Sequence, residues 1–373
     1  MFEFDDIRAY RDDEVNPVLE SLLNDSEFLA FIAQHMHPKL NRIMSYLIQK
    51  RIRKQLKNKF DHIHNVAAWQ NTLAPYVESL IKKTTDQFIV KGIENLDKND
   101  NYLFISNHRD IALDPMLVNY ALLKSGLNTS KIAIGDNLLG RQFVAKLMRL
   151  NKSFVVKRSV TARRDKLAAS QNLSAYVHES LKQGNNVWIA QKEGRAKDNQ
   201  DKTDTAVLKM LHLAGRKLGW ELKKSMVFLK IVPVSISYEW DPCDLDKANE
   251  LALLSNLQKY EKSADEDFQT ILKGLKGAKG KVSIHFSKPL DLDSNQAEDW
   301  AKEIDRCIYS GYELFDSNLL ANSILNDIDL IADKKLKFWQ SRFSKLTAEA
   351  YQQVVKSYAQ PVISKEKLDI HKN

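Results

Sequence analysis

From about residue 88 to residue 290, short apolar runs alternate with longer segments whose apolar residues recur at helical spacing. The runs predict strands at 88–92, 102–105, 131–134, 153–157, 187–190 and 281–286, and at 226–238 with a break at Pro233. Helices are predicted between them at 114–124, 162–183 and 205–218. This alternation favours an α/β fold, a mostly parallel sheet flanked by helices. Ligands of such sheets bind at the carboxyl ends of the strands.

Helical spacing without strand signals occupies both ends of the chain. It predicts helices at 17–23, 28–33, 40–56 and 69–82, and again at 296–315, 318–332 and 336–358. We expect Pro361 to end the last helix and the polar tail 365–373 to be frayed. The predicted organisation is an N-terminal helical annex (1–87), an α/β domain (88–293) and a C-terminal helical region (294–373).

One predicted N-terminal helix allows two interpretations. Within residues 40–56, Ile43, Leu47 and Ile52 share one face, and basic residues surround them. Such a stripe usually packs into a core, which is the interpretation we favour. The alternative is a basic amphipathic helix that lies on an anionic lipid surface.

Several protein classes are disfavoured. No apolar run reaches the length of about 18 residues that a membrane-spanning helix needs. The acidic start of the sequence lacks the layout of a signal peptide, so we expect a cytoplasmic protein. The two cysteines, Cys243 and Cys307, are too few for a disulfide framework or a metal quartet, and we expect reduced thiols. No histidine pair has further ligands at metal-binding spacing, so no metal is expected.

The most specific motif follows the predicted strand at 102–105, which runs directly into Asn-His-Arg-Asp at residues 107–110. His108 is followed by Asp110 and Asp114, two and six residues on. Histidine is suited to act as a general base near neutral pH, and a carboxylate partner fixes its tautomer and stabilises the imidazolium. We therefore predict that His108 removes a proton from a hydroxyl group. A structural histidine, with the aspartates capping the next helix, is the alternative.

This segment resembles the first motif of the glycerolipid acyltransferases, the superfamily of glycerol-3-phosphate and lysophosphatidate acyltransferases. The family motif is Asn-His, four residues, then Asp. Here five residues separate His108 from Asp114. Either Asp114 still reaches His108 through a local bulge, or Asp110 takes its place.

Three further segments resemble the family's other motifs, in the family's order. Residues 151–158 resemble the second motif, with Lys157 in register and Arg158 one place late. Residues 193–195, Glu-Gly-Arg after a predicted strand, resemble the third, and residues 231–239, which carry Pro233, resemble the fourth. Each motif is weak alone, but four in order are specific.

The resemblance implies roles for these residues. His108 would be the base, with Asp114 or Asp110 as its partner. Phosphate binding is assigned to the cations Lys157, Arg158 and Arg195, because a phosphate needs Arg or Lys held in place. Gly194 would let the backbone approach a ligand closely. Glu193 would accept a hydrogen bond from the acceptor hydroxyl or hold Arg195. Surface ion pairs are the alternative for each basic residue.

The implied activity is that of an O-acyltransferase. It would move a fatty acyl group from acyl-CoA or acyl-carrier protein to glycerol 3-phosphate or a lysophospholipid, without a metal or other cofactor. The net charge of +8 would attract an acidic carrier protein or an anionic membrane surface. We therefore expect a cytoplasmic protein that docks peripherally at the inner face of the membrane. No nucleic-acid-binding signature accompanies the basic clusters, so no nucleic acid is expected.

A protein of a different class is the rival hypothesis. The chain would retain the acyltransferase fold but bind lipid or acyl-carrier protein without catalysis, because the shifted Asp114 disables the base. A hydrolase is disfavoured by the lack of a Gly-x-Ser-x-Gly elbow, and a kinase by Pro115 where its catalytic loop needs Asn.

Overall fold

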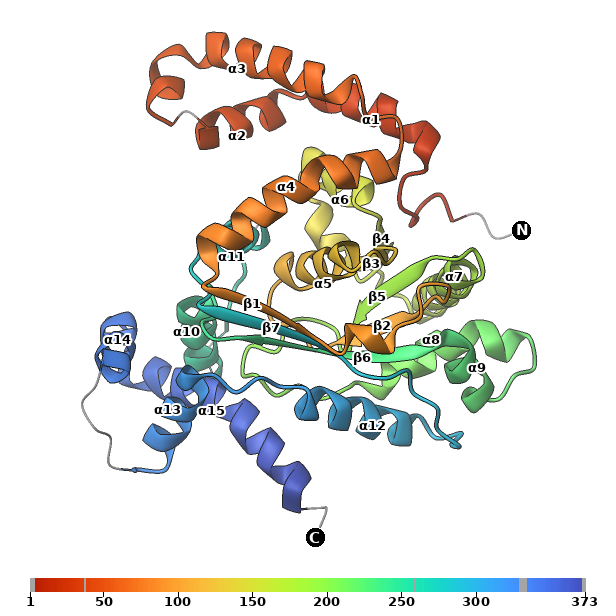
Figure 1. The fold of residues 1–373 in the computed structure, drawn as a ribbon, viewed down its shortest axis with the longest axis vertical. Helices are drawn as coiled ribbons and strands as arrows, with labels where there is room; N and C mark the ends of the chain where they lie inside the picture. The colour runs from red at the N-terminus through yellow and green to blue at the C-terminus, as the bar shows by residue number, and fades with distance from the viewer. Residues whose placement is uncertain (1–3, 37, 258, 264, 329–333, 371–373) are drawn as a thin grey trace. The chain divides into compact units, whose positions relative to one another are not determined.

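The computed structural model describes residues 4–36, 38–257, 259–263, 265–328 and 334–370, which group into two compact units. The first unit lies within Met1–Val77 and Lys131–Leu173, and the second within Glu78–Ser130 and Ser174–Asn373. The boundaries predicted at residues 87 and 293 stay predictions. Figure 1 labels the elements of both units.

The first unit is mainly helical. Its helices are α1 (Asp12–Leu23), α2 (Ser26–Met36), α3 (Pro38–Phe60), the first part of α4 (Val66–Thr84), α6 (Gln142–Leu150) and the first part of α7 (Arg163–Lys182). The strands β3 (Ser130–Gly135) and β4 (Ser153–Val156) pair in parallel. Phe143 of α6 packs on Phe28 and Phe31 of α2, with ring centroids 6.0 and 5.6 Å away. Aromatic packing thus joins the segment 131–173 to the N-terminal helices.

Helix α3 differs from the packed stripe that we favoured. Ile52 is buried at 1% exposure, as a core residue should be. Leu47 is 54% exposed and its neighbour Tyr46 is 75% exposed. The second half of the stripe therefore packs against the unit, whereas Leu47 faces away from it. The side chain of Ile43 lies outside the described residues.

The second unit is built on five strands, β1 (Gln87–Lys91), β2 (Leu103–Ser106), β5 (Asn186–Ala190), β6 (Ile231–Tyr238) and β7 (Lys281–Phe286). They lie in the order β1-β7-β6-β2-β5. All neighbours in this part of the sheet are parallel except β6 and β7, which are antiparallel. This confirms the predicted mostly parallel sheet. The carboxyl ends of β2, β5 and β6 consequently lie side by side at one edge.

Helices cover both faces of these strands (Figure 1), and α5 (Leu113–Lys124) lies on the opposite face from α12 (Ala297–Ser310). Apolar side chains of the strands and of both helices are fully buried. From the strands these are Phe104, Ile105, Val232, Ile236, Ile284 and Phe286, and from the helices Leu122, Trp300 and Ile304, each at 0% exposure. Two layers of helix around a buried sheet form the predicted α/β arrangement. The remaining helices between the strands are α8 (Thr205–Lys217), α9 (Leu222–Leu229), α10 (Asp244–Ser255) and α11 (Glu266–Lys276).

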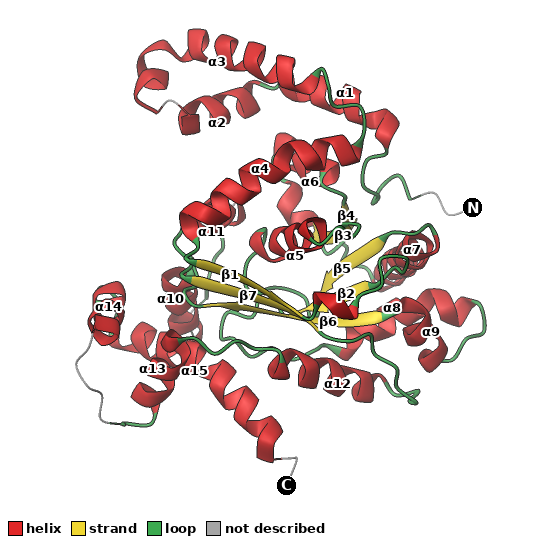
Figure 2. Ribbon diagram, viewed as in Figure 1, coloured by secondary structure: helices red, strands yellow, loops and turns green. Residues whose placement is uncertain are grey.

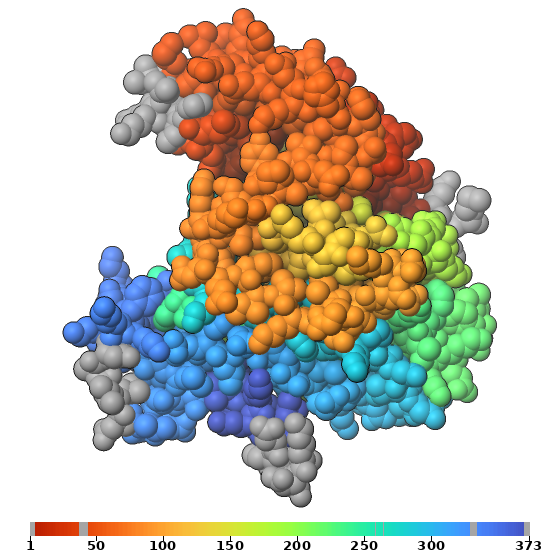
Figure 3. Space-filling model, viewed as in Figure 1, coloured from red at the N-terminus to blue at the C-terminus, as the bar shows by residue number. Residues whose placement is uncertain are grey.

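The C-terminal part of the second unit forms a separate hydrophobic cluster. Helices α13 (Asp316–Leu325), α14 (Lys334–Phe343) and α15 (Ala348–Ile370) pack with α10 around Trp339, Tyr358 and Ala359. Figure 2 shows these as helices, and Figure 3 shows their blue side chains forming a continuous surface with the neighbouring residues of this unit. The C-terminal helices are therefore tied to α10, which precedes the last strand of the sheet.

The structure corrects several predicted elements. The strand prediction that begins at residue 226 is wrong for residues 226–229, which form the end of α9. Strand β6 then runs through Pro233 without the predicted break. The proline is tolerated where the pairing with β7 ends, and its carbonyl accepts from Ser287 N at 3.0 Å. Helix 318–332 is too long, because α13 ends at Leu325, and residues 329–332 lie outside the described residues.

The last predicted helix is wrong in two respects. It is divided into α14 and α15, because the chain turns after Phe343 and the Thr347 hydroxyl accepts from Ala350 N at 3.3 Å at the start of α15. Pro361 does not end the helix, and residues 365–370 continue α15 instead of fraying. The carbonyl of Ser357, which loses its helical donor to Pro361, accepts from Asn199 Nδ2 at 2.8 Å. An outside side chain thus satisfies the group that a proline leaves unpaired.

No helix among the described residues has both the length and the apolar character needed to cross a bilayer.

Candidate active site

Asn107 joins the end of β2 to β6. Its amide nitrogen donates to the carbonyl of Ile236 at 2.9 Å, and its amide oxygen accepts from Ile236 N at 2.8 Å. The side chain is fully buried and pairs with the backbone as a neighbouring strand would. Its amide nitrogen also lies 3.2 Å from Oδ2 of Asp201. The residue before His108 is therefore fixed to the sheet.

His108 follows directly and pairs with Asp114. Nδ1 of His108 lies 2.8 Å from Oδ2 of Asp114, whose side chain is fully buried. The carboxylate accepts a hydrogen bond from Nδ1–H, which leaves Nε2 as the lone-pair nitrogen. Nε2 makes no hydrogen bond with any residue that the structure describes, and the side chain remains 14% exposed. The imidazole and the ring of Trp188 on β5 form a T-shaped pair, with centroids 5.7 Å apart.

Asp114 accepts three further hydrogen bonds. Its Oδ2 receives the backbone N–H groups of Arg109 at 2.6 Å and Asp110 at 2.9 Å, and its Oδ1 receives the Tyr238 hydroxyl at 2.8 Å. The backbone of 109–110 is thus wrapped around the carboxylate, which accommodates the additional residue between His108 and Asp114. Burial and the negative charge of Asp114 raise the pKa of Tyr238 well above its ordinary value, so this phenol stays a donor. The His108–Asp114 separation of five residues does not prevent their contact.

Asp110 occupies a different position. Its Oδ1 accepts from the backbone N–H groups of Ala112 and Leu113, each at 2.9 Å, at the start of α5. Its Oδ2 is buried without a hydrogen-bond partner among the described residues. Burial, and then the charge of Asp114, raise the pKa of Asp110 to about 6. The geometry gives Asp110 a capping position and Asp114 the position beside His108.

A buried ion pair between Arg109 and Asp201 holds the segment that follows His108. Arg109 Nη2 lies 2.5 Å from Oδ2 of Asp201, and both side chains are almost fully buried. The same carboxylate accepts from the hydroxyl of Tyr312, and its backbone carbonyl accepts from Tyr309 at 2.6 Å. These tyrosines belong to α12 and the turn after it. Arg109 is therefore held by protein groups and is not available to a substrate.

The Glu-Gly-Arg segment after β5 lies beside the His108 loop, defined as residues 107–112, because Ala196 N donates to the carbonyl of His108 at 2.9 Å. Gly194 has a φ of +78°, and a Cβ there would meet no atom within 4 Å. The backbone at Gly194 thus has the conformation that favours glycine, and the space beside it is open. Arg195 is half-buried and makes no hydrogen bond or ion pair with the rest of the described chain. Glu193 is exposed, and its role stays a prediction.

Lys157 and Arg158 belong to the first unit. The Lys157 ammonium pairs with Asp6, and both groups are partly exposed. The backbone N–H of Arg158 donates to Asp136 at 3.1 Å. Their predicted role in binding a phosphate group stays a prediction.

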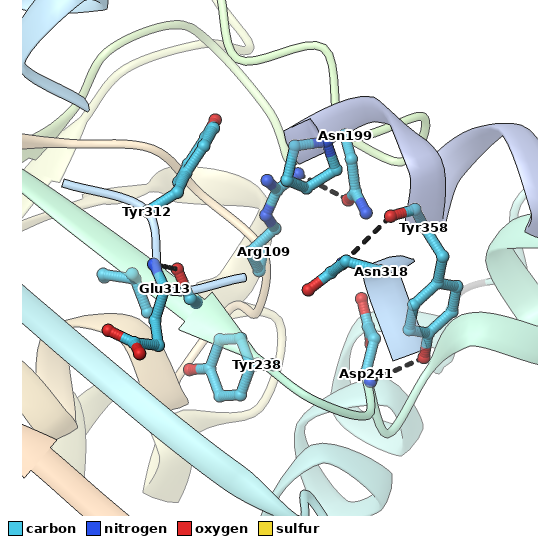
Figure 4. A pocket seen from close by; sticks show the side chains of 11 residues that line it. Arg109, Asn199, Tyr238, Asp241, Tyr312, Glu313, Asn318 and Tyr358 are labelled. Atoms are coloured by element: carbon cyan, nitrogen blue, oxygen red, sulfur yellow. Dashed lines mark hydrogen bonds between the residues drawn. The ribbon is translucent and has the colours of Figure 1, made fainter. Parts of the chain in front are cut away.

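A small cavity is lined in part by Arg109 of the His108 loop (Figure 4). Its volume is about 20 Å³, and Arg109, Tyr238, Asp241, Tyr312 and Tyr358 are among the residues that line it. Such a space holds about one water molecule, whereas small-molecule sites typically measure some 300 Å³ or more. We therefore assign the cavity to the support of the loop and not to the substrate. No cluster of three or more metal-ligating side chains occurs in the described part of the chain.

Sequence reasoning missed the residues that hold this loop. Tyr238 lies in the fourth motif, but only its strand was predicted, and Asp201 and Tyr312 carry no motif at all. The alternation of residues in β6 could have indicated that Tyr238 faces the same way as Ile236. Nothing in the sequence places Asp201 beside Arg109, because 92 residues separate them.

Comparisons with known proteins show what the chain resembles. The model of the Acyltransferase family matches residues 87–237. A glycerol-3-phosphate acyltransferase of Pseudomonas fluorescens is 27% identical over 221 residues, which are 57% of this chain and 24% of that protein. A glycerol-3-phosphate acyltransferase of Pseudomonas syringae pv. tomato is 25% identical over 220 residues, with the same coverage. The chain thus spans about a quarter of the length of these relatives.

Among solved structures, the 1-acyl-sn-glycerophosphate (LPA) acyltransferase PlsC from Thermotoga maritima aligns with 80% of this chain and 92% of its own. The sequence identity is 15% and the TM-score 0.41.

The carboxyl group of Asp110 predicts a pH-dependent stability. An aspartate in the unfolded chain titrates near pH 3.9, so between about pH 4 and 6 the folded protein holds a proton that the unfolded chain has lost. Stability is therefore lost as the pH rises through this range. Asp110→Asn keeps an oxygen for the N–H groups of Ala112 and Leu113 but does not titrate. We expect the variant to gain up to about 3 kcal/mol relative to the wild type between pH 4 and 7.

Urea unfolding at several pH values measures this difference. A difference that does not change with pH would show that Asp110 titrates normally.

Proposed function

We propose that this chain, whose residues 87–237 match the model of the Acyltransferase family, is a glycerolipid acyltransferase that transfers a fatty acyl group from a thioester to the hydroxyl group of a phosphorylated glycerol. The hydrogen bond between His108 and Asp114 is the observation that carries the proposal. The acceptor would be glycerol 3-phosphate or a lysophospholipid, and the donor acyl-CoA or acyl-carrier protein. The names of the relatives support this class of acceptor.

The proposed chemistry begins at Nε2 of His108. This nitrogen removes the proton of the acceptor hydroxyl while the oxygen attacks the thioester carbonyl. A carbon–oxygen bond forms, the carbon–sulfur bond breaks, and the departing thiolate takes the proton from the imidazolium. Asp114 stabilises the imidazolium between these steps, and Tyr238 keeps the carboxylate oriented.

The phosphate of the acceptor would be bound by Arg195. Its guanidinium is half-buried and forms no hydrogen bond or salt bridge with the described residues, although its charge helps to lower the pKa of Asp241. It follows Gly194, beside which the space is open. A planar guanidinium can hold a phosphate through two parallel hydrogen bonds. Lys157 and Arg158 are proposed to assist by resemblance to the family. Glu193 is proposed to accept a hydrogen bond from the acceptor.

The intact contact between His108 and Asp114 argues against the rival hypothesis. A non-catalytic protein that binds lipid or acyl carrier was suggested by the longer spacing between the two residues. The backbone around Asp114 accommodates that spacing.

The unpacked part of α3 supports a transient contact with an anionic membrane surface. Tyr46 and Leu47 are exposed, and basic residues follow them along the same helix. The cations Lys50, Arg51, Lys54 and Lys57 are exposed. Aromatic and aliphatic side chains next to Lys and Arg suit the boundary between lipid headgroups and acyl chains. This surface would keep the enzyme near its lipid substrates or products, at the inner face of the membrane in a cytoplasmic protein.

Acyl transfer by the purified protein tests the proposed activity. A labelled acyl-CoA or acyl-carrier protein is offered with glycerol 3-phosphate, lysophosphatidate or another lysophospholipid in separate reactions. We expect product from one acceptor class, and a loss of roughly a hundred- to ten-thousandfold in kcat for His108→Ala. Binding of lipid or carrier protein without product from any acceptor would support the rival hypothesis instead.

The two aspartates should behave differently in this assay. We expect Asp114→Asn to lower kcat by at least about a hundredfold, because the imidazole loses the partner that fixes its tautomer. Asp110→Asn keeps its capping oxygen and should retain most of the activity. The reverse pattern would assign the role of partner to Asp110.

Arg195→Met tests the phosphate assignment. The loss of a hydrogen bond to a charged group should raise the acceptor's KM by roughly ten- to a hundredfold and leave the donor's KM nearly unchanged. Arg306→Met is the control, because Arg306 forms an exposed ion pair with Glu303. An equal change in both KM values would refute the assignment.

Vesicle flotation tests the membrane contact. We expect the protein to bind vesicles that contain phosphatidylglycerol, to bind phosphatidylcholine vesicles less, and to dissociate as salt is added. The double variant Tyr46→Ser/Leu47→Ser should lose most of this binding. Leu319→Ser, at a similarly exposed leucine of α13, is the control. Equal binding by the double variant and the wild type would exclude α3 as the contact.

A further inference from the structure

We propose that the C-terminal helix α15 positions the His108 loop through two hydrogen-bonded connections that both end at Arg109. The proposal rests on the proposed function, because the loop it concerns carries the predicted base. Arg109 follows His108, and the backbone N–H groups that bind Asp114 are those of Arg109 and of the next residue, Asp110, so the placement of Arg109 determines where both groups lie. The first connection reaches the guanidinium of Arg109 and the second reaches its carbonyl.

The first connection begins where Pro361 interrupts the hydrogen bonds of α15. The freed carbonyl of Ser357 accepts from Nδ2 of Asn199 at 2.8 Å, and the amide oxygen of Asn199 accepts from Nη1 of Arg109 (Figure 4). Asn199 has a φ of +59°, a left-handed conformation that Asn tolerates better than most residues. One amide side chain thus links the backbone of α15 to the guanidinium of Arg109.

The second connection begins at Tyr358, in the next position of α15. Its hydroxyl accepts from Asp241 N at 2.9 Å and donates to Asp244 at 2.8 Å. The Asp241 carboxylate pairs with Lys247, and Nζ of Lys247 donates to the carbonyl of Arg109 at 2.6 Å. Lys247 is only 4% exposed. Burial raises the pKa of Asp241, but the charge and hydrogen bond of the Lys247 ammonium hold this pKa below its ordinary value.

These side chains support the reaction without touching the substrate. Asp241 and Asn199 line the cavity of about 20 Å³, which has no room for a glycerol phosphate. A buried ion pair such as Lys247–Asp241 contributes little net stability after the cost of desolvation. The ion pair instead fixes the direction of the Arg109 carbonyl. This also fixes the orientation of the peptide group between Arg109 and Asp110. Asn199 and Lys247 are therefore positioning residues.

The experiment uses the full-length protein and one variant for each connection. Asn199→Gly removes the amide and permits the left-handed backbone, and Lys247→Met removes the ammonium but keeps an apolar stem. The double variant Lys247→Met/Asp241→Asn removes both charges of the pair. It replaces the single variant if Lys247→Met, which leaves the Asp241 charge buried without its partner, fails to fold. The controls are Asp327→Gly, an exposed residue with a φ of +52°, and Lys273→Met, which removes an exposed ion pair with Asp246.

We expect each positioning variant to lower kcat by roughly ten- to a hundredfold with little change in either KM, because displacement of the base by a fraction of an ångström is costly. Amide hydrogen exchange in a peptide that covers 107–112 should accelerate, and the controls should match the wild type in both measurements. A lowered melting temperature with unchanged exchange in this peptide and unchanged kcat would overturn the proposal. If the wild type transfers no acyl group, the proposed function fails, while the exchange measurement still decides whether Asn199 and Lys247 hold the loop.

Discussion

The hydrogen bond between His108 and Asp114 is the interaction on which the site depends. It gives Nδ1 a fixed acceptor and leaves Nε2 without a partner among the described residues, which is the state that a general base requires. Asp114 can hold this position because two backbone N–H groups and the Tyr238 hydroxyl satisfy its remaining acceptor sites. A buried carboxylate held by so many donors does not turn away from the imidazole.

The order of strands explains how residues distant in the chain reach this pair. Strand β2 lies between β5 and β6, so the segments that follow β2 and β5 and the end of β6 share one edge of the sheet. Asn107 then joins β2 to β6, and Ala196 joins the segment after β5 to the carbonyl of His108. The C-terminal helix α15 is connected to the same loop through Asn199 and Lys247. The loop is thus attached to the sheet on one side and to helices on the other.

The sequence predicted the class of the fold and most of the strands, because short apolar runs and helical periodicity are local signals. It also named His108 and Asp114, since a motif at a strand end is visible in the order of residues. It left open which aspartate pairs with His108, because that depends on how the backbone of 109–110 turns. The contacts of Tyr238, Asp201 and Lys247 with this loop could not be predicted, since they join segments separated by about a hundred residues or more.

The errors have the same physical origin. We expected Pro361 to end a helix. This expectation holds for an isolated helix, because proline removes a helical hydrogen bond that nothing replaces there. In the folded chain, Asn199 supplies the missing hydrogen bond to Ser357, and α15 continues. The exposed Leu47 is the opposite case, because its periodicity indicated a core that the structure does not build around it. Tertiary contacts decide both outcomes.

The state of the His108 ring tests the central claim most directly. Nitrogen NMR of protein labelled at histidine distinguishes the nitrogen that carries a proton from the one that holds a lone pair, and His108→Gln identifies the signals of this ring among the nine histidines. For the neutral ring, we predict a proton on Nδ1, which is bound to Asp114, and a lone pair on Nε2. A ring that carries its proton on Nε2, or one that exchanges freely between both forms, would contradict the account.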